Sequence, residues 1–319
     1  MICLRLALAG AALAAGVAGA QSYPQKPVRV VVPFPAGGGV DAVIRQLSPK
    51  FTEALGQPFI VDNRAGASGT LGTEAVAKAA PDGYTLLGAF ASHAQNATLY
   101  RNLPYDTLKS FASVSLIATV PNFLVTHPSL PVKTVKDLIA LAKSKPGHIL
   151  YASIGNGTPA HLSAEMLKSM AGIDLTHVAY KGGAPSIIAL VAGETQLTIT
   201  TVLLGLPQVK AGRLRGIAVA SLKRSSAIPD VPTIDESGVK GYDSSSWYAL
   251  LAPARTPPEI ITRWNQTVAN VVRMPDIRER LLQQGAEPAG GPPEELDKLM
   301  RDDIAKWGRV VKALGLTAD

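Results

Sequence analysis

The stretch VVVPFPAGGGVDAV, residues 30–43, has a pattern typical of a strand, a glycine turn and a helix. An apolar run ends in a glycine-rich turn, and a helical pattern follows with one apolar face, made by Val40, Val43, Ile44, Leu47 and Phe51. Backbone N–H groups at a helix start have no partner within the helix and lie at the positive end of its dipole. The turn is therefore expected to bind an anionic group. Pro49 predicts a kink or an early end of the helix.

A second copy of this pattern lies in ILYASIGNGTPAHLSAEML, residues 149–167. Each copy contains G-x-G-x-x-A, the first at Gly37, Gly39 and Ala42 and the second at Gly155, Gly157 and Ala160. Asn156 and Thr158 suit the turn and the N-cap, and Pro159 suits the first helical position. One such motif is weak evidence. Two copies predict two helix N-termini that face one cleft and hold an anionic ligand from both sides.

Apolar, β-rich runs alternate with amphipathic segments along the chain, which predicts an α/β protein with parallel sheets covered by helices. The expected strands are Val28–Val32, Pro58–Asp62, Tyr84–Ala89, Asn122–Thr126, Ile149–Ser153, Thr176–Tyr180, Gln196–Thr200, Arg215–Ala220 and Trp247–Ala252. The expected helices include Val135–Ser144, Ala160–Met170, Pro185–Val191, Pro258–Val272 and a closing helix over Glu294–Ala313. Extended segments near 120–127 and 241–247 are expected to cross between two lobes.

Two further glycine turns follow predicted strands. In HVAYKGGAPSII, residues 177–188, the backbone of Gly182 and Gly183 is expected to matter more than Lys181, which is interpreted as a solvated turn residue. NRAGASGTLG, residues 63–72, lacks the G-x-G spacing and is interpreted as an ordinary strand-to-helix connection.

The first twenty residues are expected to be a secretory signal peptide, with Arg5, an apolar run and a small-residue end at Ala20. The chain has one cysteine, Cys3, inside that segment, so the exported protein is expected to have no disulfide or thiolate site. Without Arg5 it keeps 30 of the 31 basic residues and all 24 acidic residues, a net charge of +6. The basic residues are scattered and aromatic residues make up only 5%, which argues against a nucleic-acid surface and favours small acidic ligands.

An exported dinucleotide-dependent enzyme is the first alternative. Asp62 ends the second predicted strand, where a Rossmann unit has its ribose-binding acid. Pro33 and Pro35 at the first strand end are unusual for that fingerprint, and nicotinamide cofactors are scarce outside the cytoplasm. The sequence contains no G-x-S-x-G motif and no H-x-x-x-H spacing. Asp41 lacks a catalytic partner and is expected either to stabilise the helix start or to accept a hydrogen bond from a ligand.

Nine segments together resemble one family, the extracytoplasmic receptors of tripartite tricarboxylate transporters, also called Bug proteins. They are PVRVVVPFPAGGGVD, LGQPFIVDNRAGASG, APDGYTLL, LPYD, THPSLPV, YASIGNGTPAHL, HVAYKGGAP, IPDVPT and WYALLAPARTPP. The resemblance covers nearly all of the chain after the signal. It implies a type II periplasmic-binding-protein fold, with lobe 1 at 21–123 plus 246–319 and lobe 2 at 124–245.

The resemblance also implies a function. Such a receptor closes on a small mono- or dicarboxylate, which can be an aliphatic acid, an amino acid or an aromatic acid, and delivers it to membrane permease subunits. It is expected to use no cofactor and no metal and to have no catalytic activity. It is expected to be periplasmic and monomeric. The alternative role is that of a ligand sensor that signals to a membrane kinase, because sensing and transport use the same pair of lobes.

Carried over residue by residue, the resemblance gives a predicted ligand site. It comprises Phe34, Ala36, Gly37, Gly38, Asp41, Ser92, His93, Ser153, Gly155, Asn156, Gly157, Thr158, His161, Tyr180, Lys181 and Gly182. Thr200 and Thr201 join it at a place where the family often has an aromatic residue and then Asp or Ser. No acid stands there to bind a ligand ammonium group. Thr158 replaces the usual Ser and keeps its hydroxyl.

Overall fold

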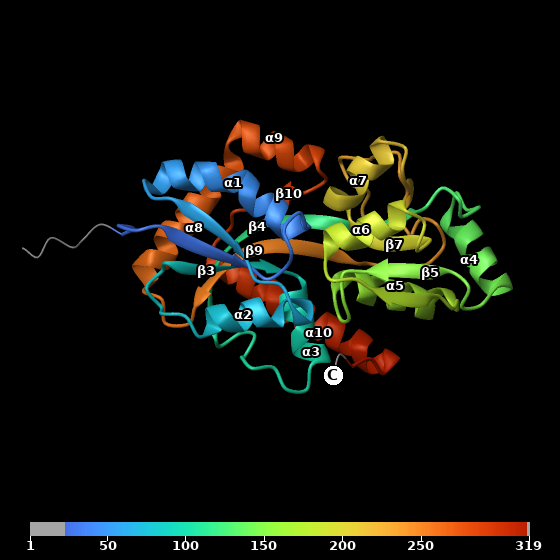
Figure 1. Ribbon diagram of the computed structural model, residues 1–319, viewed down its shortest axis with the longest axis horizontal. Coiled ribbons are helices and arrows are strands. Elements are labelled where there is room, and N and C mark those ends of the chain that lie inside the picture. Colours follow the sequence, from blue (N-terminus) through green and yellow to red (C-terminus); the bar gives the residue numbers. More distant parts are fainter. Residues whose placement is uncertain (1–22, 318–319) are drawn as a thin grey trace, which may run out of the picture.

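The computed structural model describes residues 23–317, so the predicted signal peptide lies outside the described residues. Two α/β lobes lie side by side, and two long strands run from one into the other (Figure 1). Within residues 23–317, no helix combines the length and apolar character that a membrane crossing requires.

The first lobe is built on the parallel strands β1 (Val28–Val32), β2 (Phe59–Asn63) and β3 (Thr85–Phe90). Central β1 is made only of valine and one arginine, and such β-branched runs favour a buried parallel strand. Its Val30 pairs with Val61 of β2 on one side and with Leu86 of β3 on the other. The sheet order is β2-β1-β3-β9-β4.

The long strands β4 (Phe111–Thr126) and β9 (Ser245–Pro253) join the lobes. They pair antiparallel from Phe111↔Pro253 to Pro121↔Ser245. From Asn122 onward β4 leaves this sheet and pairs with strands of the second lobe. The all-parallel prediction was therefore wrong at these strands, and the predicted strand Asn122–Thr126 is the end of a 16-residue strand.

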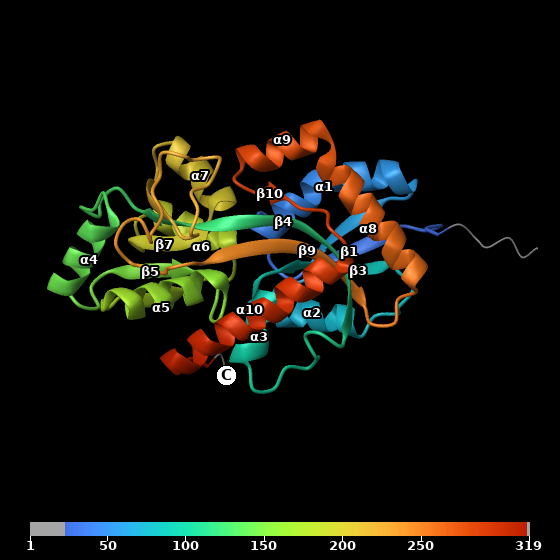
Figure 2. The same cartoon turned by 180° about the vertical axis from the view of Figure 1, so that it is seen from behind.

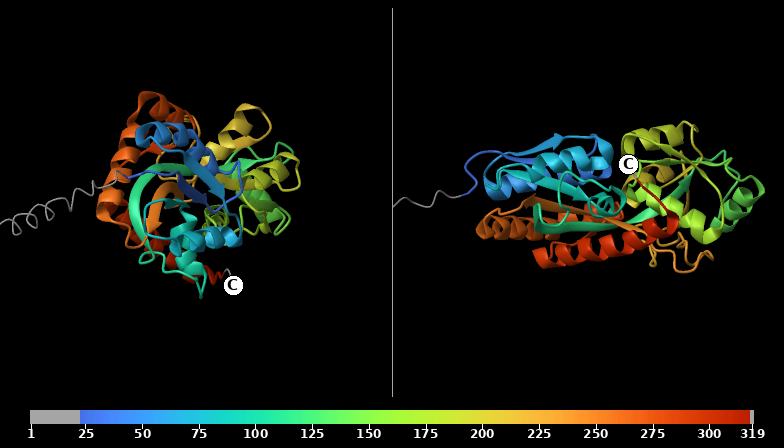
Figure 3. Two further views of the ribbon diagram at one scale, coloured as in Figure 1. Left: turned by 60° about the vertical axis from the view of Figure 1, so that its left-hand side comes forward. Right: turned by 90° about the horizontal axis from the view of Figure 1, so that it is seen from below.

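The second lobe has the strands β5 (Leu150–Ser153), β6 (Thr176–Ala179), β7 (Leu197–Thr201) and β8 (Arg215–Val219). Parallel β7, β5 and β6 continue the order from β4, and β8 pairs antiparallel with β4. The right-hand view in Figure 3 shows the two lobes end to end, with helices around the strands of each.

Helices follow the strands in both lobes. Their bounds are α1 (Gly39–Leu55), η1 (Ala67–Gly69), α2 (Thr70–Ala77), α3 (Ser92–Leu99), α4 (Val135–Ser144), α5 (Pro159–Ala171), α6 (Gly183–Val191), α7 (Val202–Lys210), α8 (Pro258–Arg273), α9 (Pro275–Gln283) and α10 (Pro293–Leu314), with the short strand β10 (Glu287–Pro288) before α10. Of the kink or early end predicted at Pro49, the early end was wrong, because α1 continues to Leu55. Leu47 and Phe51 on either side of Pro49 are fully buried, and this packing keeps the chain helical.

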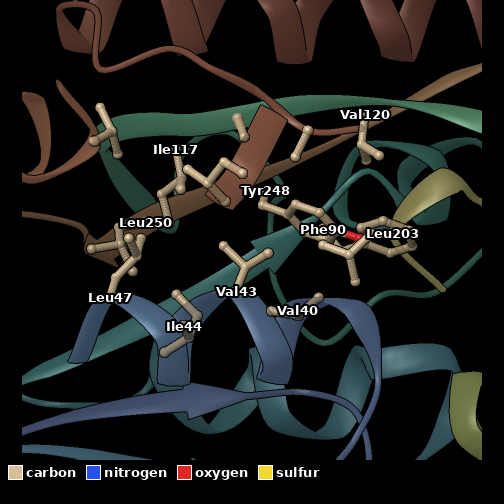
Figure 4. Packing of buried hydrophobic residues seen from close by; sticks show 14 of the residues in the cluster. Val40, Val43, Ile44, Leu47, Phe90, Ile117, Val120, Leu203, Tyr248 and Leu250 are labelled. Carbon is tan, nitrogen blue, oxygen red and sulfur yellow. The ribbon is translucent and has the colours of Figure 1, made fainter. Parts of the chain in front are cut away.

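The apolar face of α1 packs onto the crossing strands, where Val43 and Ile44 point toward Leu250 and Ile117 (Figure 4). On the opposite side, α10 runs along both lobes (Figure 2). Its Leu296 lies in the first lobe's core, whereas Trp307 packs in a cluster of second-lobe residues. The predicted closing helix is confirmed, and it contacts both β4 and α5.

Candidate ligand-binding site

The first glycine loop is held by the acid at the start of α1. Gly37 donates its N–H to Oδ2 of Asp41 at 2.9 Å, and Arg45 and Asn63 each donate to Oδ1 at 2.9 Å. Burial raises the pKa of Asp41, but these hydrogen bonds, led by that of Gly37, outweigh it and hold the pKa below its ordinary value. Asp41 is 3% exposed, so it organises the loop and has no open side toward a ligand.

In the second glycine loop a histidine accepts the hydrogen bond that Asp41 accepts in the first. Gly157 donates its N–H to Nδ1 of His161 at 3.1 Å, across the same four-residue spacing. Within the loop, Thr158 Oγ1 donates to the Gly155 carbonyl at 2.6 Å, and the Gly155 N–H donates to Ser153 Oγ at 3.1 Å. Ser153, Thr158 and His161 therefore shape the loop with their side chains.

A column of three rings lies behind this loop. The His161 ring stacks on His177 with centroids 4.3 Å apart, and His177 stacks on Tyr151 at 4.8 Å. Burial lowers the pKa of both histidines, and His161 helps to lower that of His177 to about 4. Nε2 of His177 lies 2.6 Å from Ser153 Oγ. His177 thus supports the loop in its neutral form.

The third glycine turn meets the first across the cleft. Gly182 has φ of 124°, and a Cβ there would lie 2.8 Å from Cδ of Pro35, so only glycine fits between the lobes. Tyr180 donates from its hydroxyl to Glu194 at 3.3 Å, and Lys181 is exposed.

Four helix N-termini converge on a small cavity of about 30 Å³, here called the inner cavity. It holds about two water-sized volumes. The helices are α1, α5, α6 and α7, of which three follow predicted glycine loops. The lining is Phe34, Gly38, Gly39, Val40, Phe90, Asn122, Ile154, Pro159, Ala160, Gly183, Ile199, Thr200, Thr201, Leu204 and Tyr248. No ionisable carboxyl, amine, guanidine or imidazole side chain is among them.

A larger cavity of about 640 Å³, here called the outer cavity, adjoins the inner one. It is lined by Phe34, Pro35, Ala65, Gly66, Ala67, Ser68, Gly69, Ile154, Gly155, Ala179, Tyr180, Lys181 and Gly182. Phe34 and Ile154 line both cavities. The loop at 65–69, interpreted from sequence as an ordinary connection, forms one wall of the outer cavity.

This wall also bridges the lobes. Ser68 Oγ donates to the Asn156 carbonyl at 2.7 Å. Ala67 and Ser68 have φ of 45° and 52°, in the left-handed region that few residues other than glycine adopt. The side-chain amide of Asn96 donates a hydrogen bond to the Ser68 carbonyl at 3.3 Å. The loop is therefore fixed in a conformation that presents a hydroxyl to the opposite lobe.

Only part of the predicted site lines these cavities. Phe34, Gly38, Thr200 and Thr201 face the inner cavity, and Phe34, Gly155, Tyr180, Lys181 and Gly182 face the outer one. Gly37, Asp41, Ser153, Gly157, Thr158 and His161 form or brace the loops, and Ala36 and Asn156 are exposed at the loop tips.

Ser92 and His93 are placed elsewhere. Ser92 is buried at the start of α3, and His93 is buried between Tyr105 and Phe111, with ring centroids 6.1 and 5.0 Å away. Nε2 of His93 lies 3.0 Å from the Thr107 carbonyl. The His93 imidazole is thus buried among aromatic side chains and is absent from both cavity linings.

Tyr248, Phe90 and Asn122 line the inner cavity and were missed from sequence. Tyr248 stacks on Phe90 with centroids 5.4 Å apart (Figure 4). Asn122, where β4 passes between the lobes, donates to Ser244 Oγ at 2.9 Å and accepts from Ser246 Oγ at 2.9 Å. These residues come from three strands that are separated in sequence, and although Tyr248 lies within the segment WYALLAPARTPP, no spacing marks any of the three as facing a cavity.

Asp62, the acid of the dinucleotide alternative, is engaged by basic side chains. Its carboxylate lies 2.8 Å from Nε of Arg64 and 3.7 Å from a guanidinium nitrogen of Arg29. This ion pairing gives Asp62 a structural partner on the surface of the first lobe.

A sequence profile of the tripartite tricarboxylate transporter family receptor matches residues 43–316. The chain belongs to this family. It is 36% identical to the Bordetella pertussis protein BugT, over 97% of this chain and 95% of that protein. It is also 36% identical to a UPF0065 protein from the tcbD-tcbE intergenic region of Pseudomonas, over 99% of this chain and 96% of that protein.

Solved structures of receptors of this kind have the same fold. Rpa4515 of R. palustris with adipate superposes with a TM-score of 0.90 at 39% identity, covering 92% of this chain and 99% of that one. The periplasmic binding protein BugD gives a TM-score of 0.89 at 34% identity, with the same coverage. MatC of Rhodopseudomonas palustris with bound malate gives 0.86 at 32% identity, covering 91% of this chain and all of that one. The predicted family and two-lobed fold are confirmed.

Proposed function

We propose that this protein is a periplasmic receptor that captures a small mono- or dicarboxylate between its lobes and delivers it to a membrane permease. The observation that carries the proposal is the convergence of the N-termini of α1, α5, α6 and α7 on a cavity without ionised side chains. Helix N-termini stabilise an anion through backbone N–H groups and aligned dipoles. A carboxylate can therefore be bound without an opposing full charge.

The relatives support the same ligand class, since Rpa4515, at 39% identity, was solved with adipate and MatC, at 32% identity, with malate. Delivery to a permease follows from the family's role as transporter receptors. The periplasmic location is supported by BugD, a periplasmic binding protein. We propose a binding protein without catalytic activity.

The proposed lobes are 21–123 plus 246–319 and 124–245. The crossing of β4 at Asn122 and the start of β9 at Ser245 support these limits. The Ser68–Asn156 hydrogen bond and the contact of Pro35 with Gly182 bring the lobes together. Ligand exchange then requires the lobes to separate about these strands, and a ligand that contacts both lobes favours the closed arrangement.

A thermal-shift screen over a carboxylate library tests the proposal, followed by calorimetry on each hit. A ligand that binds only the folded state stabilises it by about 2.7 kcal/mol at a concentration one hundred times its Kd. The proposal predicts a stabilising acid that the protein leaves chemically unchanged. Absence of any stabilising acid, or consumption of a bound acid during incubation, would contradict it.

Delivery is tested separately by uptake of the identified radiolabelled acid in cells with and without the gene for this chain. The proposal expects uptake to be lost and then restored by the intact gene. A growth or transcription response to the acid, with uptake unchanged, would favour the sensor alternative.

A further inference from the structure

Two hydroxyl groups face the inner cavity without a fixed partner. Tyr248 and Thr201 are 1% and 4% exposed, and neither hydroxyl makes a hydrogen bond of ordinary geometry within residues 23–317. Burial raises the pKa of Tyr248, and the nearby Thr201 hydroxyl partly offsets that rise. A buried polar group without a partner costs about 1–3 kcal/mol, so both hydroxyls are placed to gain from a polar ligand atom.

The Tyr248 hydroxyl lies directly at the start of α1. A Cβ at Gly39 would overlap this oxygen, and Gly39 supplies one of the first N–H groups of the helix. Thr201 is the N-cap residue of α7. The two side-chain donors therefore stand beside two of the converging helix N-termini, where a carboxylate oxygen is favoured.

The remaining walls are apolar. Side chains of Phe34, Val40, Phe90, Ile154, Ile199 and Leu204 enclose the inner cavity. Phe34 and Ile154 also line the outer cavity, so a ligand that reaches from one cavity into the other passes between them. An uncharged hydrocarbon segment suits that passage, because it replaces water against apolar surface.

Neither cavity offers an acid to a cationic ligand group. Asp and Glu are missing from both linings, and the one charged side chain there is Lys181. The acid of the first glycine loop, Asp41, already accepts hydrogen bonds from Gly37, Arg45 and Asn63. A buried ammonium group without an anionic partner is strongly unfavourable.

From these contacts we infer that Tyr248 and Thr201 determine specificity by donating to a ligand carboxylate in the inner cavity, and that the ligand is a carboxylic acid whose body carries no ammonium group. The inference rests on the proposed function and narrows its ligand class. It excludes amino acids as preferred ligands while retaining aliphatic and aromatic acids.

Matched pairs of acids test the ligand class by calorimetry on the full exported protein at pH 7. The pairs are succinate and aspartate, glutarate and glutamate, adipate and 2-aminoadipate, and phenylacetate and phenylglycine. Within each binding pair we expect the amino member to bind at least tenfold more weakly. An amino member that binds as tightly as its partner overturns the inference alone, whereas failure of all eight acids overturns the proposed function with it.

Tyr248→Phe and Thr201→Val test the two hydroxyls while keeping side-chain size. Each is expected to weaken binding of the best acid about tenfold or more, since a hydrogen bond to a charged group is lost. Tyr105→Phe and Thr195→Val are the matched controls, because their hydroxyls are also buried but lie outside both cavity linings. Unchanged affinity in Tyr248→Phe and Thr201→Val overturns the assignment.

Unfolding of the ligand-free variants separates recognition from structure. The inference expects Tyr248→Phe and Thr201→Val to unfold at or above the wild-type temperature without ligand, because each removes an unpartnered buried hydroxyl, and to lose only the ligand-induced rise in Tm. A lower ligand-free Tm with a full ligand-induced rise assigns the hydroxyls to stability and overturns the inference.

Discussion

Gly157 donates its backbone N–H to Nδ1 of His161, four residues further along the chain, at 3.1 Å. Gly37 makes the equivalent bond to Oδ2 of Asp41 at 2.9 Å in the other lobe. Both acceptors are the third residue of a helix, α5 and α1, that starts at the inner cavity. The His161 imidazole and the Asp41 carboxylate thus accept equivalent backbone hydrogen bonds, and each bond holds a glycine loop against the start of the helix that follows it.

His161→Ala is expected to weaken ligand binding about fivefold, because it removes an acceptor worth about 1 kcal/mol to the loop. His161→Asn is expected to retain more affinity, since its amide oxygen can accept from Gly157 as Asp41 accepts from Gly37. Calorimetry with the acid found in the screen measures both. His148→Asn, at an exposed position, is the control, and equal losses in the Ala and Asn variants would contradict the prediction.

Stability is expected to fall with acidification below about pH 6.5. Burial lowers the pKa of His93 to about 4, and its Nδ1 has no partner among the described residues. Between about pH 6.5 and 4 the unfolded chain binds the proton that the folded chain excludes, so the free energy of unfolding decreases as pH falls through this window. From pH 7 to 5 His93 accounts for about 2 kcal/mol.

Urea unfolding at pH 7 and pH 5 measures this dependence, with His93→Gln as the comparison. The glutamine amide can still donate to the Thr107 carbonyl but does not titrate in this range. His177, whose pKa is also about 4, adds to the slope, whereas the half-buried Asp303, whose pKa is raised by desolvation, opposes it. These contributions are common to both proteins, so an identical pH dependence in the variant would refute the role of His93.

Ser68→Ala is expected to weaken ligand binding about fivefold by removing the hydrogen bond that Ser68 donates to Asn156 across the lobes. Alanine keeps the same backbone requirement at φ of 52°, so the change isolates the hydroxyl. Ser144→Ala removes a hydroxyl bonded only within α4 and serves as the control. Small-angle scattering should also show a more open ligand-free protein, and unchanged affinity and scattering would argue against a role in closure.

Gly39→Ala is expected to reduce ligand affinity at least tenfold and to lower Tm, because its Cβ would overlap the Tyr248 hydroxyl. Adding Tyr248→Phe should restore much of the lost Tm, since the overlapping oxygen is removed. Thermal unfolding of the single and double variants measures this coupling. Gly308→Ala in α10, where a Cβ meets only ordinary contact with Thr98, should instead stabilise by up to about 1 kcal/mol. Additive effects of Gly39→Ala and Tyr248→Phe would contradict the predicted clash.

Local signals in the sequence determined the two glycine loops, the helices behind them and most strands. Strand, turn and helix are specified by neighbouring residues, so VVVPFPAGGGVDAV and ILYASIGNGTPAHL predicted where anions are favoured. Motif content also determined the family. The antiparallel crossing of β4 and β9 was missed because it pairs residues more than 120 positions apart, such as Pro121 and Ser245.

Which side chains face the ligand cavities follows from the packing of the elements and could not be read from local sequence patterns. Tyr248 reaches the start of α1 because β9 pairs with both β3 and β4, and Ser68 reaches Asn156 because the lobes meet there. The tertiary structure likewise places His93 beside Tyr105 and Phe111. It also directs hydrogen bonds from Gly37, Arg45 and Asn63 to the Asp41 carboxylate. Such contacts depend on how separate elements pack against one another, and the spacing of residues along the chain does not contain that information.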